Sequence, residues 1–331
     1  MTIHSIRLSN SSPQNRRSIS QLPINLFASV MGVTGLSLAW REAAKSIDLL
    51  ALPGEIIGWF GTLIFLGLTG GYVAKWVRHP SEVASEFAHP VQSNFFATVA
   101  IGLLLQSAFL SRYTPALAQG VWIAASALTF ALAYAVTIAF LSRQQSRETT
   151  LPPLLIPGVA TLDIAVTGYA IPFSWAHELN MFAFSIGSVM ATVFIALIFG
   201  RLRHEDPVPL LARPSLMVLV APFAVGFLAY TNITGTVDLF ATVLFYFALF
   251  LLLVLSPMVF RRHIPFSVAW WAISFPLAAL SIAFFRYARA VDNAILAILA
   301  GVLFVFLAAA IAILLVRTAS IVLTGKLFEV R

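Results

Sequence analysis

The sequence of 331 residues contains no cysteine and few charged side chains. The absence of cysteine excludes disulfides, thiolate metal sites and a cysteine nucleophile. Only 10% of the residues are charged, whereas 60% are hydrophobic, and the mean hydropathy is +0.93. A soluble domain carries roughly 25% charged residues, so this chain cannot cover a globule with polar surface. The composition predicts a protein that folds in lipid.

Long apolar runs recur along the whole chain. A bilayer core needs roughly 20 apolar residues for each helix that crosses it. Ten stretches are candidates: 24–40, 56–76, 93–111, 119–142, 154–172, 179–200, 216–233, 238–260, 266–285 and 293–316. The connections between them are short. The sequence therefore predicts one all-α transmembrane domain over 21–318, a flexible cytoplasmic tail over 1–20 and a short cytoplasmic tail over 319–331.

Lysines and arginines are distributed unevenly between the two sides that these spans define. Fifteen fall on the side of both termini, and five fall on the other side: Arg41, Lys45, Arg112, Arg286 and Arg289. Basic residues favour cytoplasmic loops, so both termini are expected in the cytoplasm. The net charge of +7 is then a topology signal, and nucleic-acid binding is not expected.

Helix-breaking residues recur in the odd-numbered spans, at intervals of about one helical hairpin. Backbone breaks at membrane depth are tolerated where they are buried in protein or line a wet cavity. Taken singly, each is better explained as an incidental kink in a packed bundle. Taken together, they predict that the odd helices surround a path and that the path is lined by kinks at Gly32, Gly35, Gly102, Pro157, Gly158, Pro222, Gly226 and Pro276.

Two further side chains are candidates for functional positions within the spans. Asp163 lies well inside a span and shares a helical face with Thr167. It either contacts an ion or proton on the path or is a hydrogen-bonded residue near the end of a kinked helix. Phe275 is followed one turn on by two alanines. Its ring can project over them and block a pore, although an aromatic residue at this depth is more often packing.

Motifs for metal binding or catalysis are lacking. His79 and His89 flank one loop, and the run His204–Asp206 places adjacent side chains on another, so neither has the spacing of a metal site. The sequence also lacks the phosphate-binding, nucleophile-elbow and dinucleotide-binding signatures. We expect no metal, no cofactor and no enzymatic activity.

Six short stretches resemble a known family, and they occur in the order found there. They are GVTGLSLAWR (32–41), EFAHPVQSNFF (86–96), LLIPGVAT (154–161), LVAPFAVGFLAY (219–230), WWAISFPLAAL (270–280) and LTGKLFEV (323–330). Together they resemble the tellurite-resistance/C4-dicarboxylate transporter family, which includes bacterial TehA proteins, yeast-type malate permeases and plant guard-cell slow anion channels. The most specific pieces are HPV before the third span and the WAISF run in the ninth.

The resemblance implies a fold and a site. It implies ten helices in five tandem hairpins, with the odd helices around a central pore. It also implies a homotrimer with one pore in each protomer, in the inner (plasma) membrane of a bacterium. Phe275 would plug the pore, and Pro276 would bend the helix that carries the plug. The family often has proline in the first and third helices where this chain has glycine, so those kinks are expected to be shallower.

The function expected from the resemblance is a gated anion channel or uniporter for small inorganic or dicarboxylate anions. No buried arginine or lysine is expected in the inner helices, which favours a diffuse positive potential over a fixed cationic ligand and a tight anion site. The alternative is a proton-coupled transporter of C4-dicarboxylates or a related oxyanion such as tellurite, with Asp163 as the proton site. A third hypothesis is a membrane scaffold or resistance factor that transports nothing.

Overall fold

The computed structural model describes residues 19–324 apart from 48, 143, 145 and 262, and every regular element in them is helical. The predicted all-α fold is thus confirmed for the described residues, while positions 1–18 and 325–331 of the predicted tails lie outside them. The α-helices are α1 (Ala28–Ala43), α2 (Ala51–Arg78), α3 (Pro80–Ala88), α4 (Ala97–Leu110), α5 (Pro115–Ser142), α6 (Ile156–Thr167), α7 (Ala176–His204), α8 (Ala221–Thr234), α9 (Leu239–Val259), α10 (Ser274–Ala290) and α11 (Ala294–Leu323). The 3₁₀ segments are η1 (Ile19–Gln21), η2 (Ile24–Phe27), η3 (Gln92–Phe96), η4 (Arg147–Thr149), η5 (Pro152–Leu155), η6 (Leu210–Val220) and η7 (Val268–Ile273).

Each predicted span overlaps one helical segment, although the boundaries differ. Within the described part of the chain, eight helical segments are long and apolar enough to cross a bilayer. The segments at α1 and at Pro152–Thr167 are not among the eight. Helix α2 begins five residues before its predicted start, and α11 continues to Leu323. The chain is therefore a multi-pass membrane protein.

Five helices form a closed inner ring. Helix α1 contacts α4, α4 contacts α6, α6 contacts α8, α8 contacts α10, and α10 returns to α1. Each has a largely buried surface: 72% of the most apolar window of Val268–Ala290 is buried, against 17% for α2. The ring is held by small residues and hydroxyls as well as by bulky apolar side chains, which allows close helix packing.

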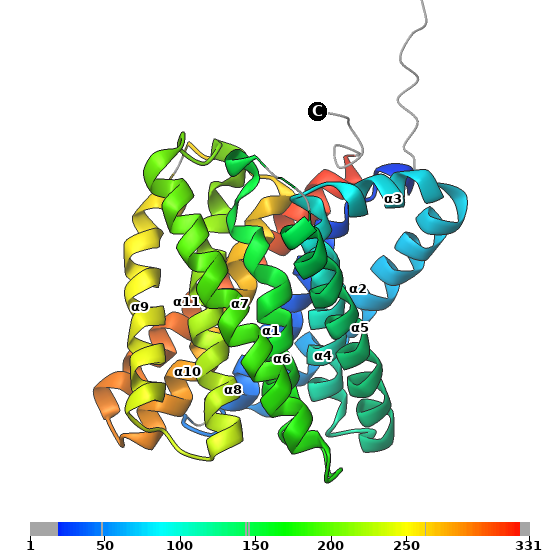
Figure 1. Cartoon of the computed structure of the whole chain (residues 1–331). Helices are drawn as coiled ribbons and strands as arrows, with labels where there is room; N and C mark the ends of the chain where they lie inside the picture. The colour runs from blue at the N-terminus through cyan, green and yellow to red at the C-terminus, as the bar shows by residue number, and fades with distance from the viewer. Residues whose placement is uncertain (1–18, 48, 143, 145, 262, 325–331) are drawn as a thin grey trace, which may run out of the picture.

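The remaining long helices form an outer layer around this ring (Figure 1). Each packs on the inner helix that precedes it in the chain, in the pairs α1–α2, α4–α5, α6–α7, α8–α9 and α10–α11. Their outward faces carry many exposed large apolar side chains, such as Leu63, Leu253 and Val305. Such faces fit a hydrocarbon surrounding and would be unfavourable in water.

A change of helix type recurs at the same place in all five inner segments. Each begins as a 3₁₀ helix and continues as an α-helix: η2 into α1, η3 into α4, η5 into α6, η6 into α8 and η7 into α10. In three of them a proline, Pro157, Pro222 or Pro276, follows the change within the first turn of the α-helix. A proline is favoured at the start of an α-helix because its fixed φ is already helical and the N–H groups of that turn have no acceptor within the same α-helix. This accounts for prolines in the middle of apolar runs.

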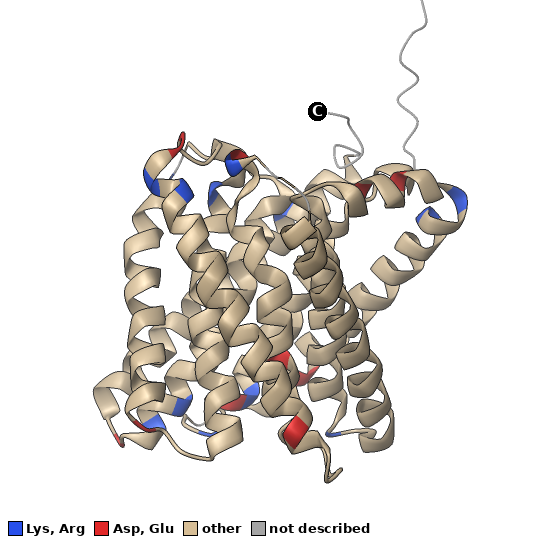
Figure 2. Cartoon of the chain, in the orientation of Figure 1, with Lys and Arg blue, Asp and Glu red and all other residues tan. Residues whose placement is uncertain are grey.

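Both described ends of the chain, η1 and the end of α11, lie at the same end of the bundle (Figure 1). We call it the proximal end and the opposite one the distal end. Lysines and arginines concentrate near the two ends, with few between them (Figure 2). The short helix α3 lies across the proximal end and was not anticipated from the sequence.

A buried ion pair ties α3 to α2 at the proximal end. The Lys75 side chain is only 1% exposed, and its ammonium lies 2.8 Å from the Glu86 carboxylate. It also donates to the carbonyl of Leu22, and the Tyr72 hydroxyl donates to Glu86. The Lys75 ammonium on α2 thereby joins the backbone at Leu22 to α3.

Candidate functional site

Three cavities lie along the centre of the ring, and each is lined by all five inner segments. The vestibule, about 550 Å³, is formed at the proximal end mostly by the 3₁₀ segments. The narrow cavity, about 30 Å³, lies where the segments change helix type. The wide cavity, about 370 Å³, lies on the distal side and is formed by the α-helical parts. The inner ring thus encloses space at three successive levels.

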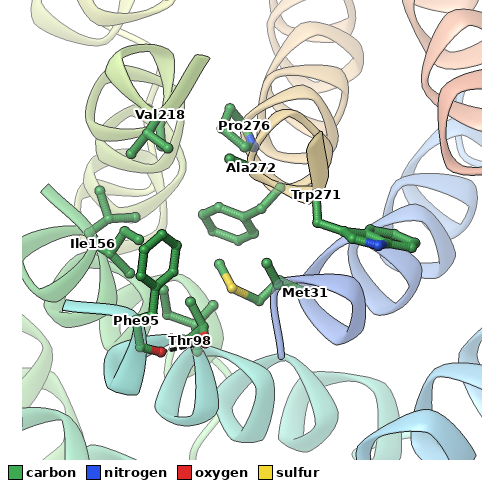
Figure 3. Close-up of a pocket in the computed structure, with 13 residues that line it drawn as sticks. Met31, Phe95, Thr98, Ile156, Val218, Trp271, Ala272 and Pro276 are labelled. Carbon is green, nitrogen blue, oxygen red and sulfur yellow. Dashed lines mark hydrogen bonds between the residues drawn. The ribbon is translucent and has the colours of Figure 1, made fainter. Parts of the chain in front are cut away.

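The narrow cavity is small and apolar. About 10–15 Å³ is needed to hold one water molecule, so its 30 Å³ admits about two. Figure 3 shows the side chains of Met31, Ile156 and Val218 around it. Its polar side chain, Thr98, donates its hydroxyl proton to the carbonyl of Phe95 at 2.6 Å. The lining therefore offers little to stabilise a water or an ion.

Two phenylalanine side chains each line two of the three cavities. Phe275 lines both the narrow and the wide cavity, and its side chain is buried. Phe95 lines both the vestibule and the narrow cavity, and its ring points into the narrow one (Figure 3). Phe275 is the second residue of α10, directly before Pro276. The change from η7 to α10 therefore sets where its ring lies.

Asp163 faces the wide cavity. Its side chain is 1% exposed, and the carboxyl oxygen Oδ2 has no hydrogen-bond partner among the described residues. Thr167 lines the same cavity and donates its hydroxyl proton to the backbone carbonyl of Asp163 at 2.7 Å. The two residues predicted to share a face thus both line this cavity. The Oδ2 atom of Asp163 remains available for a hydrogen bond.

The glycines and prolines predicted to kink the path have different surroundings. Gly35 lines the wide cavity and Pro276 the narrow one. Gly32 and Gly35 lie within an uninterrupted α1 and pack against α10, where an added Cβ would lie 2.6 Å from that of Ser274 and 2.8 Å from that of Ala278, respectively. Gly158 packs against α7, and added Cβ atoms at Gly102 and Gly226 would make ordinary contacts.

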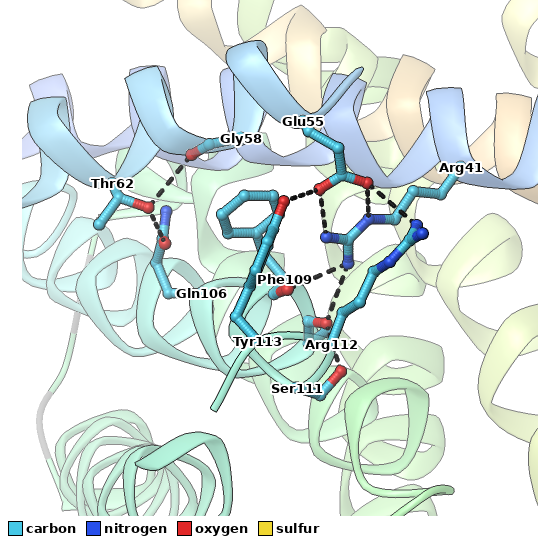
Figure 4. A network of polar contacts seen from close by, with 10 residues as sticks. Arg41, Glu55, Gly58, Thr62, Gln106, Phe109, Ser111, Arg112 and Tyr113 are labelled. Carbon is cyan, nitrogen blue, oxygen red and sulfur yellow. Dashed lines mark hydrogen bonds and ion pairs between the residues drawn. The ribbon is translucent and has the colours of Figure 1, made fainter. Parts of the chain in front are cut away.

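Most of the basic residues at the distal end form salt bridges. Arg41 pairs with Glu55 through two hydrogen bonds, of 2.9 and 2.7 Å, and Arg112 approaches the same carboxylate (Figure 4). Tyr113 also donates to Glu55, and this hydrogen bond raises the pKa of the tyrosine. Glu42 pairs with both Lys45 and Arg289. The five residues assigned to one side from the sequence do gather at one end.

Arg286 is the exception among these cations. It lies on α10 and lines the wide cavity, where Nη1 donates to Asn232 at 2.6 Å and Thr231 at 2.9 Å. Among the described residues no carboxylate lies within 4 Å of it. The expectation that the inner helices hold no arginine or lysine of this kind was therefore wrong, because α10 places Arg286 at the wide cavity. The signal was present in the spacing, because Arg286 follows Phe275 by eleven residues, which is three helical turns.

Within the described residues, no three histidine, aspartate or glutamate side chains converge in a way that could hold a metal ion. His79 begins the turn into α3, and His89 accepts hydrogen bonds from the backbone N–H groups of Val91 and Gln92. His89 thus helps to shape the entry to η3. The polar side chains of the pathway are therefore mainly amides and His89 in the vestibule, and basic, hydroxyl and carboxyl groups in the wide cavity.

A ring of buried helices around cavities in series, inside an apolar outer layer, defines a membrane channel or transporter. A family model described as "Voltage-dependent anion channel" matches residues 21–319, and the chain belongs to this family. The resemblance inferred from the six short stretches is thereby confirmed.

Individual relatives are named as channels or as a resistance protein. The chain is 26% identical over 296 residues to the S-type anion channel SLAH2 of Arabidopsis thaliana, covering 86% of this chain and 56% of the relative. It is 30% identical over 294 residues to the plant S-type anion channel SLAH4, covering 85% and 78%. It is 25% identical over 270 residues to the tellurite resistance protein TehA homolog of Haemophilus influenzae, covering 78% and 79%. The chain spans about half the length of SLAH2 and of its relative SLAH3.

Proposed function

We propose that this protein is a gated anion channel or uniporter and that the ring of Phe275 closes its pathway. The observation that carries the proposal is that Phe275 lines both the narrow and the wide cavity. Membership of an anion-channel family supports the choice of substrate. The names of the relatives also favour a transport protein over an enzyme.

The closed state follows from the chemistry of the narrow cavity. An anion that enters it must lose most of its hydration, and the lining supplies no charged group in exchange. Apolar constrictions of this kind block ions by excluding water as well as by steric hindrance. Removal of the Phe275 ring would join the narrow and the wide cavity, so that water and anions could pass that level.

The test is the current carried by purified protein in planar bilayers under a chloride gradient. We expect Phe275→Ala to carry a large anion-selective current and the wild type to carry little. The matched control is Phe285→Ala, which removes the same ring from the same helix where it packs against Phe304 of α11. Absence of current from a folded and inserted Phe275→Ala variant would refute the assignment.

We further propose that the chain crosses the membrane ten times, as five tandem hairpins with both termini in the cytoplasm. The recurrence of the 3₁₀-to-α change in all five inner segments supports this arrangement, and so does the excess of basic residues on the side of the termini. Because the chain contains no cysteine, single cysteines at Thr114 and Ser146 can be labelled in intact bacteria. An impermeant maleimide should label only the Thr114→Cys variant.

We also propose a homotrimer in the bacterial inner membrane, as the resemblance implies. The three cavities lie within one chain, which supports one pathway in each protomer. Native mass spectrometry from a mild detergent should give three times the chain mass of 36.0 kDa. A monomer or dimer as the main species would contradict this assembly.

The second candidate function is a proton-coupled transporter of dicarboxylates or oxyanions. It is favoured by Asp163, whose carboxyl group is buried at the wide cavity with an unpartnered oxygen. A buried carboxyl in such a place can exchange a proton with an anion that passes. Uphill uptake of malate driven by a pH gradient in vesicles, and its loss in Asp163→Asn, would favour this candidate over the channel.

A further inference from the structure

Arg286 keeps part of its hydrogen-bonding capacity unused in the wide cavity. Its Nη1 group donates to Asn232 and Thr231 at the end of α8. Its Nε and Nη2 groups donate to no described residue. These two nitrogens lie on one edge of the planar guanidinium, so they offer two parallel donors. The side chain is anchored from one edge and leaves the other edge for a ligand.

The positive charge of Arg286 also has no salt-bridge partner among the described residues. Two carboxylates line the same cavity, Asp163 and Glu42, and Glu42 already binds Lys45 and Arg289. Glu55 is occupied by Arg41. The lining of the wide cavity therefore has three cations, Arg41, Lys45 and Arg286, against its two carboxylates, and Arg286 is the cation without a salt bridge among the described residues. Such a surplus inside low-dielectric walls raises the local concentration of anions.

The position of Arg286 places a bound anion on the pathway. An interval of eleven residues from Phe275 corresponds to about 16 Å along an α-helix and about 20° around it. The two side chains thus lie on nearly the same face of α10, and both line the wide cavity. Its volume of about 370 Å³ accommodates a small anion together with several water molecules.

We propose that Arg286 forms an anion-binding subsite in the wide cavity and that it prefers planar oxyanions, namely nitrate or a carboxylate, to chloride. The preference follows from geometry, because two coplanar oxygens can accept from Nε and Nη2 at once, whereas a halide has a single centre. The inference rests on the proposed anion-channel function for its physiological role. It adds a substrate class and a residue that recognises it.

The test is a binding measurement that needs no current. The midpoint of thermal unfolding is followed for the purified full-length protein in detergent while sodium nitrate replaces sodium chloride at constant ionic strength. For the wild type we expect a saturating rise of about 2 °C when nitrate reaches roughly ten times its dissociation constant. Weakly hydrated anions such as nitrate do not stabilise proteins by exclusion from the surface, so a saturating rise reports a site.

Three variants define the residue and the geometry. Arg286→Gln should lose the rise. Arg289→Gln should retain it, because this exposed arginine lies one turn away on the same helix and pairs with Glu42. Arg286→Lys keeps the charge but lacks the planar fork, so it should bind anions without preferring nitrate. Should Arg286→Gln fail to fold, the lysine variant still tests the preference.

The outcomes separate this inference from the proposed function. A saturating rise that persists in Arg286→Gln would overturn the subsite, and so would an equal loss in Arg289→Gln, which would indicate diffuse charge. Current through Phe275→Ala, with no nitrate-dependent rise in the unfolding midpoint of the wild type, would refute the subsite alone. A nitrate-dependent rise in the unfolding midpoint that requires Arg286, together with no current through Phe275→Ala, would support the subsite and refute the channel.

Discussion

Replacing Gly32 by alanine tests the contact that sets the position of the Phe275 ring. Gly32 on α1 faces Ser274, the first residue of α10, and an added Cβ would lie 2.6 Å from the Ser274 Cβ. Ordinary contacts begin near 3.4 Å. Ser274 is fully buried, and its Cβ is fixed to the backbone. The two helices must therefore separate by about 1 Å.

The magnitude follows from two opposed effects. Overpacking of a well-packed contact costs about 1–3 kcal/mol, while glycine-to-alanine replacement inside a helix gains about 1 kcal/mol. We expect Gly32→Ala to lower the free energy of unfolding by up to about 2 kcal/mol. Gly226→Ala is the control, because its added Cβ would meet Leu244 at an ordinary 3.8 Å. That variant should be as stable as the wild type or more stable, by up to about 1 kcal/mol.

The assay is reversible unfolding in mixed detergent micelles, combined with bilayer recording. Displacement of Ser274 moves the adjacent Phe275, so Gly32→Ala should also carry a small anion current, below that of Phe275→Ala. Gly226→Ala should carry none. If Gly32→Ala matched the wild type in both stability and current, the close contact between α1 and α10 would not fix the ring, and the reasoning would fail.

Three further predictions concern other parts of the structure. Phe95→Ala should stay silent alone, because Phe275 still closes the pathway, but it should increase the current of Phe275→Ala in the double variant, because the Phe95 ring narrows another level of the opened pathway; a large current from Phe95→Ala alone in bilayers would contradict this order. Glu86→Gln should destabilise the protein by about 3 kcal/mol in detergent unfolding, because Lys75 is left buried and unpaired, and Lys75→Met in the same chain should restore much of the loss. Asp238 caps α9 by accepting from the backbone amide three residues on, which lowers its pKa; its contribution is present above its ordinary pKa of 3.8 and is lost as the pH falls through the lower folded-state value. The difference in unfolding midpoint between the wild type and Asp238→Ala should therefore vanish on acidification below that value, and a constant difference would exclude the cap as its cause.

Hydropathy was sufficient to find the helices because lipid imposes a long apolar run on each crossing. It could not find η7 or the other 3₁₀ segments, because the two helix types use the same apolar residues. Nor could it find α3, a nine-residue helix whose amphipathic pattern is short and flanked by prolines. Helix type depends on neighbours in space, which a hydropathy profile does not contain.

The candidate site was predicted unevenly for a similar reason. Asp163 could be assigned to the path because a carboxyl group inside a span needs an interior surrounding, and it does line the wide cavity. Arg286 was counted as a loop charge because it follows the apolar run. Its role depends on how far α10 extends and on which carboxylates lie nearby. The glycines of α1 looked like kinks, although their partner helix explains them as contacts.

The change of helix type in α10 gives the ring a way to move without breaking the helix. One residue advances the chain by about 2.0 Å and 120° in a 3₁₀ helix, and by about 1.5 Å and 100° in an α-helix. If the boundary beside Ser274 moved by one residue, the α-helical part would turn by about 20° and slide by about 0.5 Å relative to η7. Five such boundaries encircle the narrow cavity. Small rotations of this kind, each coupled to a translation along the helix axis, would widen or narrow the ring of helices around the narrow cavity.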